Sequence, residues 1–136
     1  EIKKKIGMSI SSIFDKQGES GFRIIESQML EELSIKPKSV ISTGGGIVLM
    51  KENRVIMKNE TCVYLKIDFE EQLKRLNDSD DRPLVGKNSD GLIKKINAAR
   101  EPFFIDLANI VIDTSNLNEN EVTQQILSSL KSKNEN

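Results

Sequence analysis

The chain has 136 residues, of which 37% are hydrophobic and 30% charged, and its formal net charge is −1. This composition is typical of one soluble globular domain, and the balanced charge gives no overall field that would attract nucleic acid. One cysteine and no histidine argue against a disulfide framework and a zinc site, and no apolar run reaches the length of a membrane span. We therefore expect a cytoplasmic protein whose partners are neither membranes nor nucleic acids.

Helices are expected in the first part of the chain. A lysine-rich start runs up to Gly7, which is typical of a helix end. Ser9 can cap a second helix, which Gly18 and Gly21 interrupt. A further helix follows, and Pro37 ends it. The apolar stripe of that helix, at helical spacing, consists of Phe22, Ile25, Met29 and Leu33.

The stretch Val40-Ile41-Ser42-Thr43-Gly44-Gly45-Gly46 is the most informative part of the sequence. A short β-branched strand that ends in glycines is typical of a parallel sheet whose carboxyl edge opens into a ligand loop. Glycine lets backbone N–H groups approach a ligand without a Cβ in the way. A flexible turn without any ligand explains the glycines about equally well, because short glycine runs are weak motifs.

Helices and strands alternate in the rest of the chain. The segment 52–58 is predicted to be a helix, 62–67 a strand covered on both faces, and 110–112 a further strand. Such alternation predicts a parallel sheet in an α/β fold, and nothing in the sequence indicates a second domain. The inward positions of the remaining helices are predicted to be Phe69, Leu73, Leu76, Leu92, Ile96, Ala99, Phe103, Val122, Ile126 and Leu130.

Arginine is used sparingly, and most of the arginines stand near predicted loops or helix ends. The planar guanidinium suits carboxylate and phosphate groups, which lysine matches only as a point charge. Glu26 follows Arg23 by three residues and could orient it. For any single arginine, a surface salt bridge is the better explanation. The arginines in question are Arg23, Arg75, Arg82 and Arg100.

Four motifs taken together resemble shikimate kinase. They are Gly21-Phe22-Arg23-x-x-Glu26, Ser42-Thr43-Gly44-Gly45-Gly46, Asp81-Arg82-Pro83-Leu84 and Arg100-Glu101-Pro102-Phe103, in that family's order and spacing. The resemblance extends to about residue 130. It implies an α/β fold of the nucleoside-monophosphate-kinase-like P-loop type, in three layers around a five-stranded parallel sheet. It also implies transfer of the γ-phosphoryl group of ATP to the 3-hydroxyl of shikimate, with Mg²⁺, in chorismate biosynthesis.

The same resemblance implies which residues bind shikimate. Arg23 and Arg100 would bind its carboxylate, and Glu26 would brace Arg23. The glycine triplet, Gly44, Gly45 and Gly46, would face the substrate with its backbone N–H groups.

On the nucleotide side, the resemblance assigns three residues. Arg82 would lie on a lid over residues 77–90, bind ATP and act as the catalytic residue by approaching the transferred phosphate. Arg75 would pack against adenine, with Asn116 in the turn beside it. These roles suit phosphoryl transfer, which needs positioning and charge neutralisation more than covalent chemistry.

One large part of the family pattern is absent from these 136 residues. The P-loop motif G-x-x-x-x-G-K-[ST] does not occur, nor does the second strand that ends in an Asp-x-Asp pattern in the family. The missing part includes the central strand, which in the family lies between the strands of Val40-Ile41 and 62–67. We therefore expect an incomplete sheet within one domain over 1–136, no metal ligand in this chain, and no activity without the missing part. We expect the full-length enzyme to be a monomer.

Two other interpretations stay open at this point. The chain could belong to a catalytically dead homologue that binds a ligand or a partner without turnover. It could also belong to another small-molecule kinase of the superfamily, such as a gluconate kinase, although a pair of arginines suits a carboxylate on a compact ring better. The codons upstream of Glu1 would separate a shortened kinase from a dead homologue.

Overall fold

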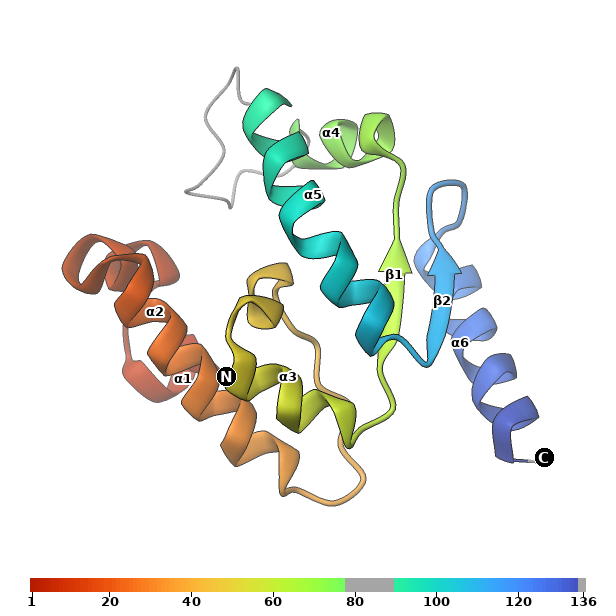
Figure 1. Cartoon of the computed structure of the whole chain (residues 1–136), viewed down its shortest axis with the longest axis horizontal. Helices are drawn as coiled ribbons and strands as arrows, with labels where there is room; N and C mark the ends of the chain where they lie inside the picture. The colour runs from red at the N-terminus through yellow and green to blue at the C-terminus, as the bar shows by residue number, and fades with distance from the viewer. Residues whose placement is uncertain (78–89, 135–136) are drawn as a thin grey trace. The chain divides into compact units, whose positions relative to one another are not determined.

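The computed structural model describes residues 1–77 and 90–134. They belong to two compact units, Glu1–Glu60 and Thr61–Asn136, which are described separately below. Figure 1 traces the chain from the helices of the first unit to the strands and helices of the second.

Two helices open the first unit. Helix α1 (Ile2–Ile6) ends at Gly7, whose left-handed φ of 71° closes it as predicted. Helix α2 (Ile10–Ser34) begins after Ser9, whose side chain accepts a hydrogen bond from the Ser12 N–H. The predicted interruption is confirmed at Gly18, which is non-helical (φ 68°, ψ −176°). Gly21 instead lies within the helix, where a Cβ would come within 2.5 Å of the Gln17 Cβ.

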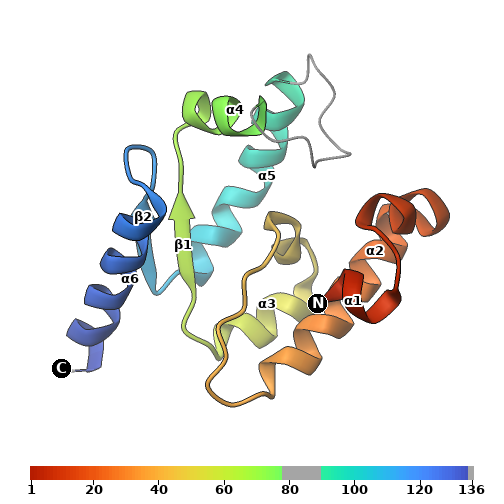
Figure 2. The same ribbon diagram turned by 180° about the vertical axis from the view of Figure 1, so that it is seen from behind.

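The rest of this unit packs on α2. The 3₁₀ helix η1 (Gly45–Leu49) and helix α3 (Lys51–Lys58) both contact it and each other. Ile47 and Val48 of η1 are buried, so the apolar residues after the glycines form part of the core. Figure 2 shows η1 and α3 from behind. The core of the unit consists of Ile13, Phe22, Met29, Leu30, Ile47 and Val48.

The predicted strand at Val40-Ile41 is wrong. These residues have no strand assignment, and Val40 is fully exposed. A β-strand needs a neighbour to satisfy its backbone N–H and C=O groups, and the described residues provide none here. The partner that the family resemblance implies lies in the part that has no counterpart in this sequence.

The second unit contains a two-stranded parallel sheet. Strand β1 (Val63–Lys66) pairs with β2 (Ile110–Asp113), with Val63 opposite Ile110. The connection runs through α4 (Phe69–Asn77) and α5 (Asp90–Leu107), as a parallel pair requires. Helix α6 (Glu119–Asn134) follows and packs against β2. The predicted alternation of strands and helices is confirmed here.

The described sheet is smaller and more exposed than predicted. Strand β1 is not covered on both faces, because Leu65 is 47% exposed. On α5 the buried residues are Ile93 and Leu107, whereas the predicted Leu92 is half exposed. Two strands of four residues offer little area for helices to cover. The five-stranded, three-layer architecture is therefore present only in part.

Over residues 1–77 and 90–134, no helix is both long and apolar enough to cross a membrane.

Candidate functional site

Arg23 is the centre of the candidate site in the first unit. It lies on α2 just after the break at Gly18, and only 8% of the residue is exposed. Its Nη1 donates to Glu26 Oε2 at 2.7 Å, and its Nη2 donates to Glu19 Oε1 at 3.2 Å. Glu26 is also buried, so this ion pair is held away from water and is not the surface salt bridge that is usual for such a pair.

The glycine triplet lies against this ion pair. A Cβ on Gly46 would stand 2.2 Å from Arg23 Nη1 and 2.4 Å from its Cζ, so no side chain fits there. A Cβ on Gly44 would stand 3.5 Å from Glu26 Oε1. Since the φ of Gly44 is an ordinary −74°, close approach rather than an unusual backbone conformation explains these glycines. The structure thus brings Arg23, Glu26 and the predicted loop together.

One donor of the guanidinium has no partner among the described residues. Arg23 Nε is buried and makes no hydrogen bond. A buried donor without a partner costs free energy on the order of 1–3 kcal/mol. The Phe22 ring centroid lies 5.4 Å from Cζ, and the Phe14 and Phe22 rings are 4.6 Å apart. Aromatic rings beside a guanidinium with one unpartnered N–H donor suit an anion carried on an apolar body.

Two residues that the sequence analysis missed hold the glycine loop. Asn53, which is fully buried, donates from Nδ2 to the Ile47 carbonyl at 2.9 Å. Arg54 Nη1 donates to the Val48 carbonyl at 2.7 Å and to the Leu49 carbonyl at 3.0 Å. Consecutive α3 residues therefore fix consecutive carbonyls of η1. The signal that could have found them is a polar Asn on the inward face of an otherwise amphipathic helix.

A cavity of about 560 Å³ lies in the same unit. Glu26 and Gly44 line it together with the apolar side chains Met29, Leu30 and Leu33. Its volume is within the range of small-molecule sites.

The second unit contains the predicted nucleotide residues Arg75 and Asn116. Arg75 Nε donates to Glu71 Oε1 at 2.8 Å, and Nη2 donates to the Thr114 carbonyl at 2.9 Å. The Arg75 bond lowers the pKa of Glu71 below its usual range. Arg75 therefore lies beside the turn after β2 as expected, with Asn116 exposed at its end.

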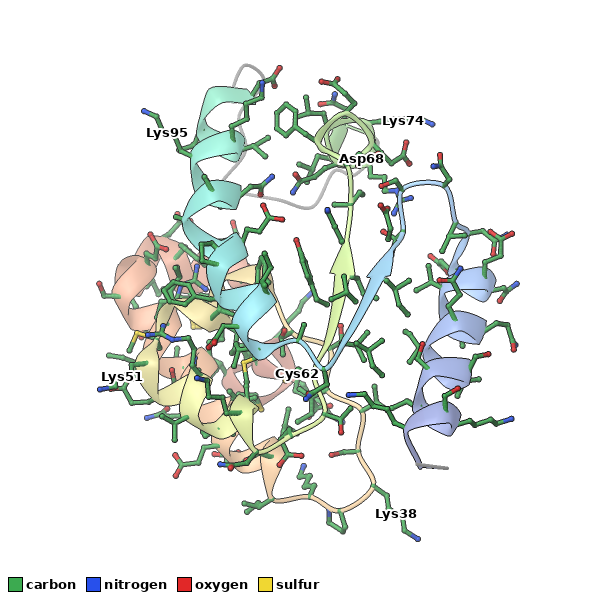
Figure 3. The ribbon with its side chains drawn as sticks, turned by 45° about the vertical axis from the view of Figure 1, so that its right-hand side comes forward. Lys38, Lys51, Cys62, Asp68, Lys74 and Lys95 are labelled. Atoms are coloured by element: carbon green, nitrogen blue, oxygen red, sulfur yellow. The ribbon has the colours of Figure 1, made fainter. Side chains whose placement is uncertain are left out.

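That turn is tied down by a chain of hydrogen bonds. Ser115 donates to Asp113 Oδ1 from its hydroxyl at 2.6 Å and from its N–H at 3.0 Å. These bonds lower the pKa of the Asp113 carboxyl. The Ser115 hydroxyl oxygen accepts from the Asp68 N–H at 2.8 Å, so the turn is fixed to the start of α4. Figure 3 shows Asp68 at the carboxyl end of β1.

The described structure does not test the remaining predicted site residues. Arg100 is half-buried on α5 in the second unit, whereas Arg23 belongs to the first. The paired arginine clamp therefore stays a prediction. Arg82 lies outside the described residues, as does all of the predicted lid except its end residues, Asn77 and Asp90.

The P-loop motif that would hold the triphosphate does not occur in these 136 residues. Across 1–77 and 90–134, no three Asp, Glu, His or Cys side chains gather as a metal ion requires. That this chain contains no metal ligand stays a prediction.

Comparison with known proteins gives consistent matches along the chain. The family model for shikimate kinase matches residues 1–131. A shikimate kinase of Enterococcus faecalis is 41% identical over 131 residues, which is 94% of this chain and 77% of the relative. One from Dictyoglomus turgidum is 38% identical over 135 residues, or 96% of this chain and 78% of that protein.

Solved structures agree with these relatives. The shikimate kinase from Acinetobacter baumannii in complex with shikimate matches with a TM-score of 0.91 at 32% identity, over 97% of this chain and 75% of that one. The Aquifex aeolicus enzyme matches with a TM-score of 0.81 at 38% identity, over 97% and 77%. The chain belongs to the shikimate kinase family.

Proposed function

We propose that the protein phosphorylates the 3-hydroxyl of shikimate with ATP, giving shikimate 3-phosphate for chorismate biosynthesis. The observation that supports this best is Arg23, a buried arginine with an unpartnered Nε, braced by Glu26 and packed on Gly46. This arrangement fits a compact ring acid, whose carboxylate would take the free donor. The solved relative from Acinetobacter baumannii is in complex with shikimate.

The described residues suggest how this chain would hold the acceptor. Arg23 would bind the carboxylate together with Arg100, and the backbone N–H groups of Gly45 and Gly46 would face the substrate. Fixing the ring in this way would orient the 3-hydroxyl. Its oxygen would then bond to the γ-phosphorus of ATP, the bond from that phosphorus to the bridging oxygen would break so that ADP leaves, and the hydroxyl proton would be released to water. Positioning of this kind supplies much of the rate gain in phosphoryl transfer.

The nucleotide side of the proposal rests on the second unit. Arg75, held by Glu71 and the Thr114 carbonyl, offers a flat guanidinium face for adenine, with Asn116 beside it. Arg82, on a lid over 77–90, would approach the transferred phosphate. The phosphate cradle and the Mg²⁺ ligands of the family would belong to the part of the family pattern that these 136 residues lack. We also propose that the full-length enzyme is cytoplasmic and monomeric, and that residues 1–136 form part of a single domain.

The catalytically dead homologue is the second candidate, because the P-loop motif does not occur in these residues. Reading the codons upstream of Glu1 separates the two. An in-frame P-loop supports the kinase, and a start codon without one supports the binding protein. The match to the shikimate kinase model over 1–131 disfavours a gluconate kinase.

Calorimetric titration with shikimate tests the substrate assignment. In a longer form of the protein that includes a P-loop segment, Arg100→Ala should weaken shikimate binding by about 2–4 kcal/mol, since it removes one arm of a charge-assisted clamp. The methyl ester of shikimate, which lacks the negative charge, is the control ligand, and its affinity should change little. If Arg100→Ala left the affinity for shikimate unchanged, Arg100 would not be part of the carboxylate site.

A further inference from the structure

Glu19 lies beside the candidate site without belonging to any of the motifs that define it. It follows the break at Gly18, and its Oε1 lies 3.2 Å from Arg23 Nη2. The side chain of Glu19 is 58% exposed, whereas that of Glu26 is only 7% exposed. Two carboxylates thus contact one guanidinium, one from the interior and one from the solvent side.

The two carboxylates hold different parts of Arg23. Glu26 takes Nη1, and Glu19 takes Nη2, which shares an edge of the guanidinium with the unpartnered Nε. A carboxylate that binds arginine in a bidentate manner takes two neighbouring nitrogens at once. A ligand on the edge of Nε and Nη2 would satisfy the orphaned donor and would compete with Glu19 for Nη2.

The contacts of Arg23 with Glu26 and with Glu19 differ in strength, and this difference determines which carboxylate a ligand can displace. Glu26 is buried, so removing its partner would leave a desolvated charge, which is costly. Glu19 is exposed at helical spacing from Arg23, and pairs of that kind contribute only a few tenths of a kcal/mol. A ligand carboxylate can therefore displace Glu19 at little cost but cannot displace Glu26.

The net charge of the site also disfavours small anions. Glu19, Arg23 and Glu26 together have a formal charge of −1, so an anion that approaches Arg23 meets a negative surrounding. A simple anion gains only the guanidinium contact, whereas a ring acid also gains the aromatic wall of Phe14 and Phe22.

We propose that Glu19 is a displaceable carboxylate that occupies Arg23 Nη2 in the free protein and sets the site's selectivity against small anions. This inference rests on the proposed function only for the identity of the ring acid. Inorganic phosphate, a compact anion with no apolar body, is the kind of competitor that Glu19 keeps away from Arg23.

The test replaces Glu19 by its neutral isostere. Glu19→Gln and the wild-type chain are titrated by calorimetry with shikimate and with inorganic phosphate. Removing the repulsion and leaving only a weaker, neutral acceptor on Nη2 should tighten binding of both ligands by about threefold to tenfold, with the larger gain for phosphate at low salt. The control is Glu31→Gln, which removes the same charge from an exposed position on the same helix and should change neither affinity by more than about twofold.

The sign of the change in affinity distinguishes a displaceable carboxylate from a brace. If Glu19 were only a brace for Arg23, Glu19→Gln would weaken shikimate binding, and the inference would be overturned. Unchanged phosphate affinity in Glu19→Gln, or no phosphate binding by that variant, would overturn it as well. If the wild-type 136-residue chain fails to bind shikimate, the phosphate arm still decides the role of Glu19, and titration of the longer form with shikimate decides the proposed function. An NMR signal of Arg23 Nε–H that shifts on ligand addition locates the binding on that edge.

Discussion

Gly46 and Arg23 share a space that only one side chain can fill, because a Cβ on Gly46 would lie 2.2 Å from the Nη1 atom of the guanidinium. Gly46→Ala should therefore push Arg23 away from Glu26. We expect a loss of about 1–3 kcal/mol in unfolding free energy and a loss of shikimate affinity on the order of tenfold to a hundredfold.

Gly91→Ala is the matched control, since a Cβ there meets nothing within 4 Å. Chemical denaturation and calorimetry on both variants check the prediction. Similar stability and affinity in Gly46→Ala and Gly91→Ala would show that Arg23 can move without consequence.

The brace from α3 gives a second prediction. Asn53→Ala removes the donor to the Ile47 carbonyl and leaves that buried carbonyl unpaired, so we expect a loss of about 1–3 kcal/mol. Asn59 makes the same kind of bond, to the Val55 carbonyl, on the exposed surface. Asn59→Ala should change stability by less than about 0.5 kcal/mol. If urea denaturation gave equal losses of unfolding free energy for Asn53→Ala and Asn59→Ala, burial of the Asn53 bond would not explain its contribution.

The third prediction concerns pH. The Ser115 bonds lower the pKa of Asp113 in the folded state, so their stabilisation is present above the ordinary aspartate pKa and is lost as the pH falls through the lowered value. Ser115→Ala should move the titration midpoint of Asp113 upward in NMR spectra of the carboxyl group. Ser129→Ala, which removes an exposed hydroxyl bond on α6, should leave it in place. A midpoint that does not move in Ser115→Ala would assign the shift to another group.

Catalysis gives the fourth prediction. We expect no shikimate-dependent ADP release from the 136-residue chain, because a P-loop supplies both the N–H cradle and the lysine for the phosphates. A longer form that includes a P-loop segment is the positive control. In that form, Arg82→Ala should lower kcat more than it raises KM, since its contact strengthens in the transition state. Sustained turnover by the 136 residues alone, free of host kinase, would contradict the prediction.

Local signals predicted much of the fold and of the site. The helix ends at Gly7 and Gly18, the cap at Ser9 and the parallel strands depend on short-range chemistry that the sequence contains. The contact of Arg23 with Glu26 follows from helical spacing.

Features that depend on distant neighbours were harder to predict. Val40-Ile41 has the composition of a strand, but a strand forms only beside a partner, and propensity does not reveal whether one is present. The predicted inward face of α5 is shifted by one residue, since Ile93 is buried and Leu92 is half exposed. Both residues are apolar, so hydrophobicity alone does not tell which of the two faces the core. The position of Asn53 on the inward face of an amphipathic helix is a local signal, but no sequence pattern reveals its partner, which is a backbone carbonyl.

The break at Gly18 also fixes where two aromatic rings can meet. Phe14 and Phe22 are eight residues apart in the sequence, and an unbroken helix would separate them by about 12 Å along its axis. The positive φ of Gly18 instead turns the chain back, so that the rings lie 4.6 Å apart beside Arg23. The width of the apolar wall is thus determined by one backbone dihedral, and a residue with a Cβ at position 18 would change the shape of the site without contacting any ligand.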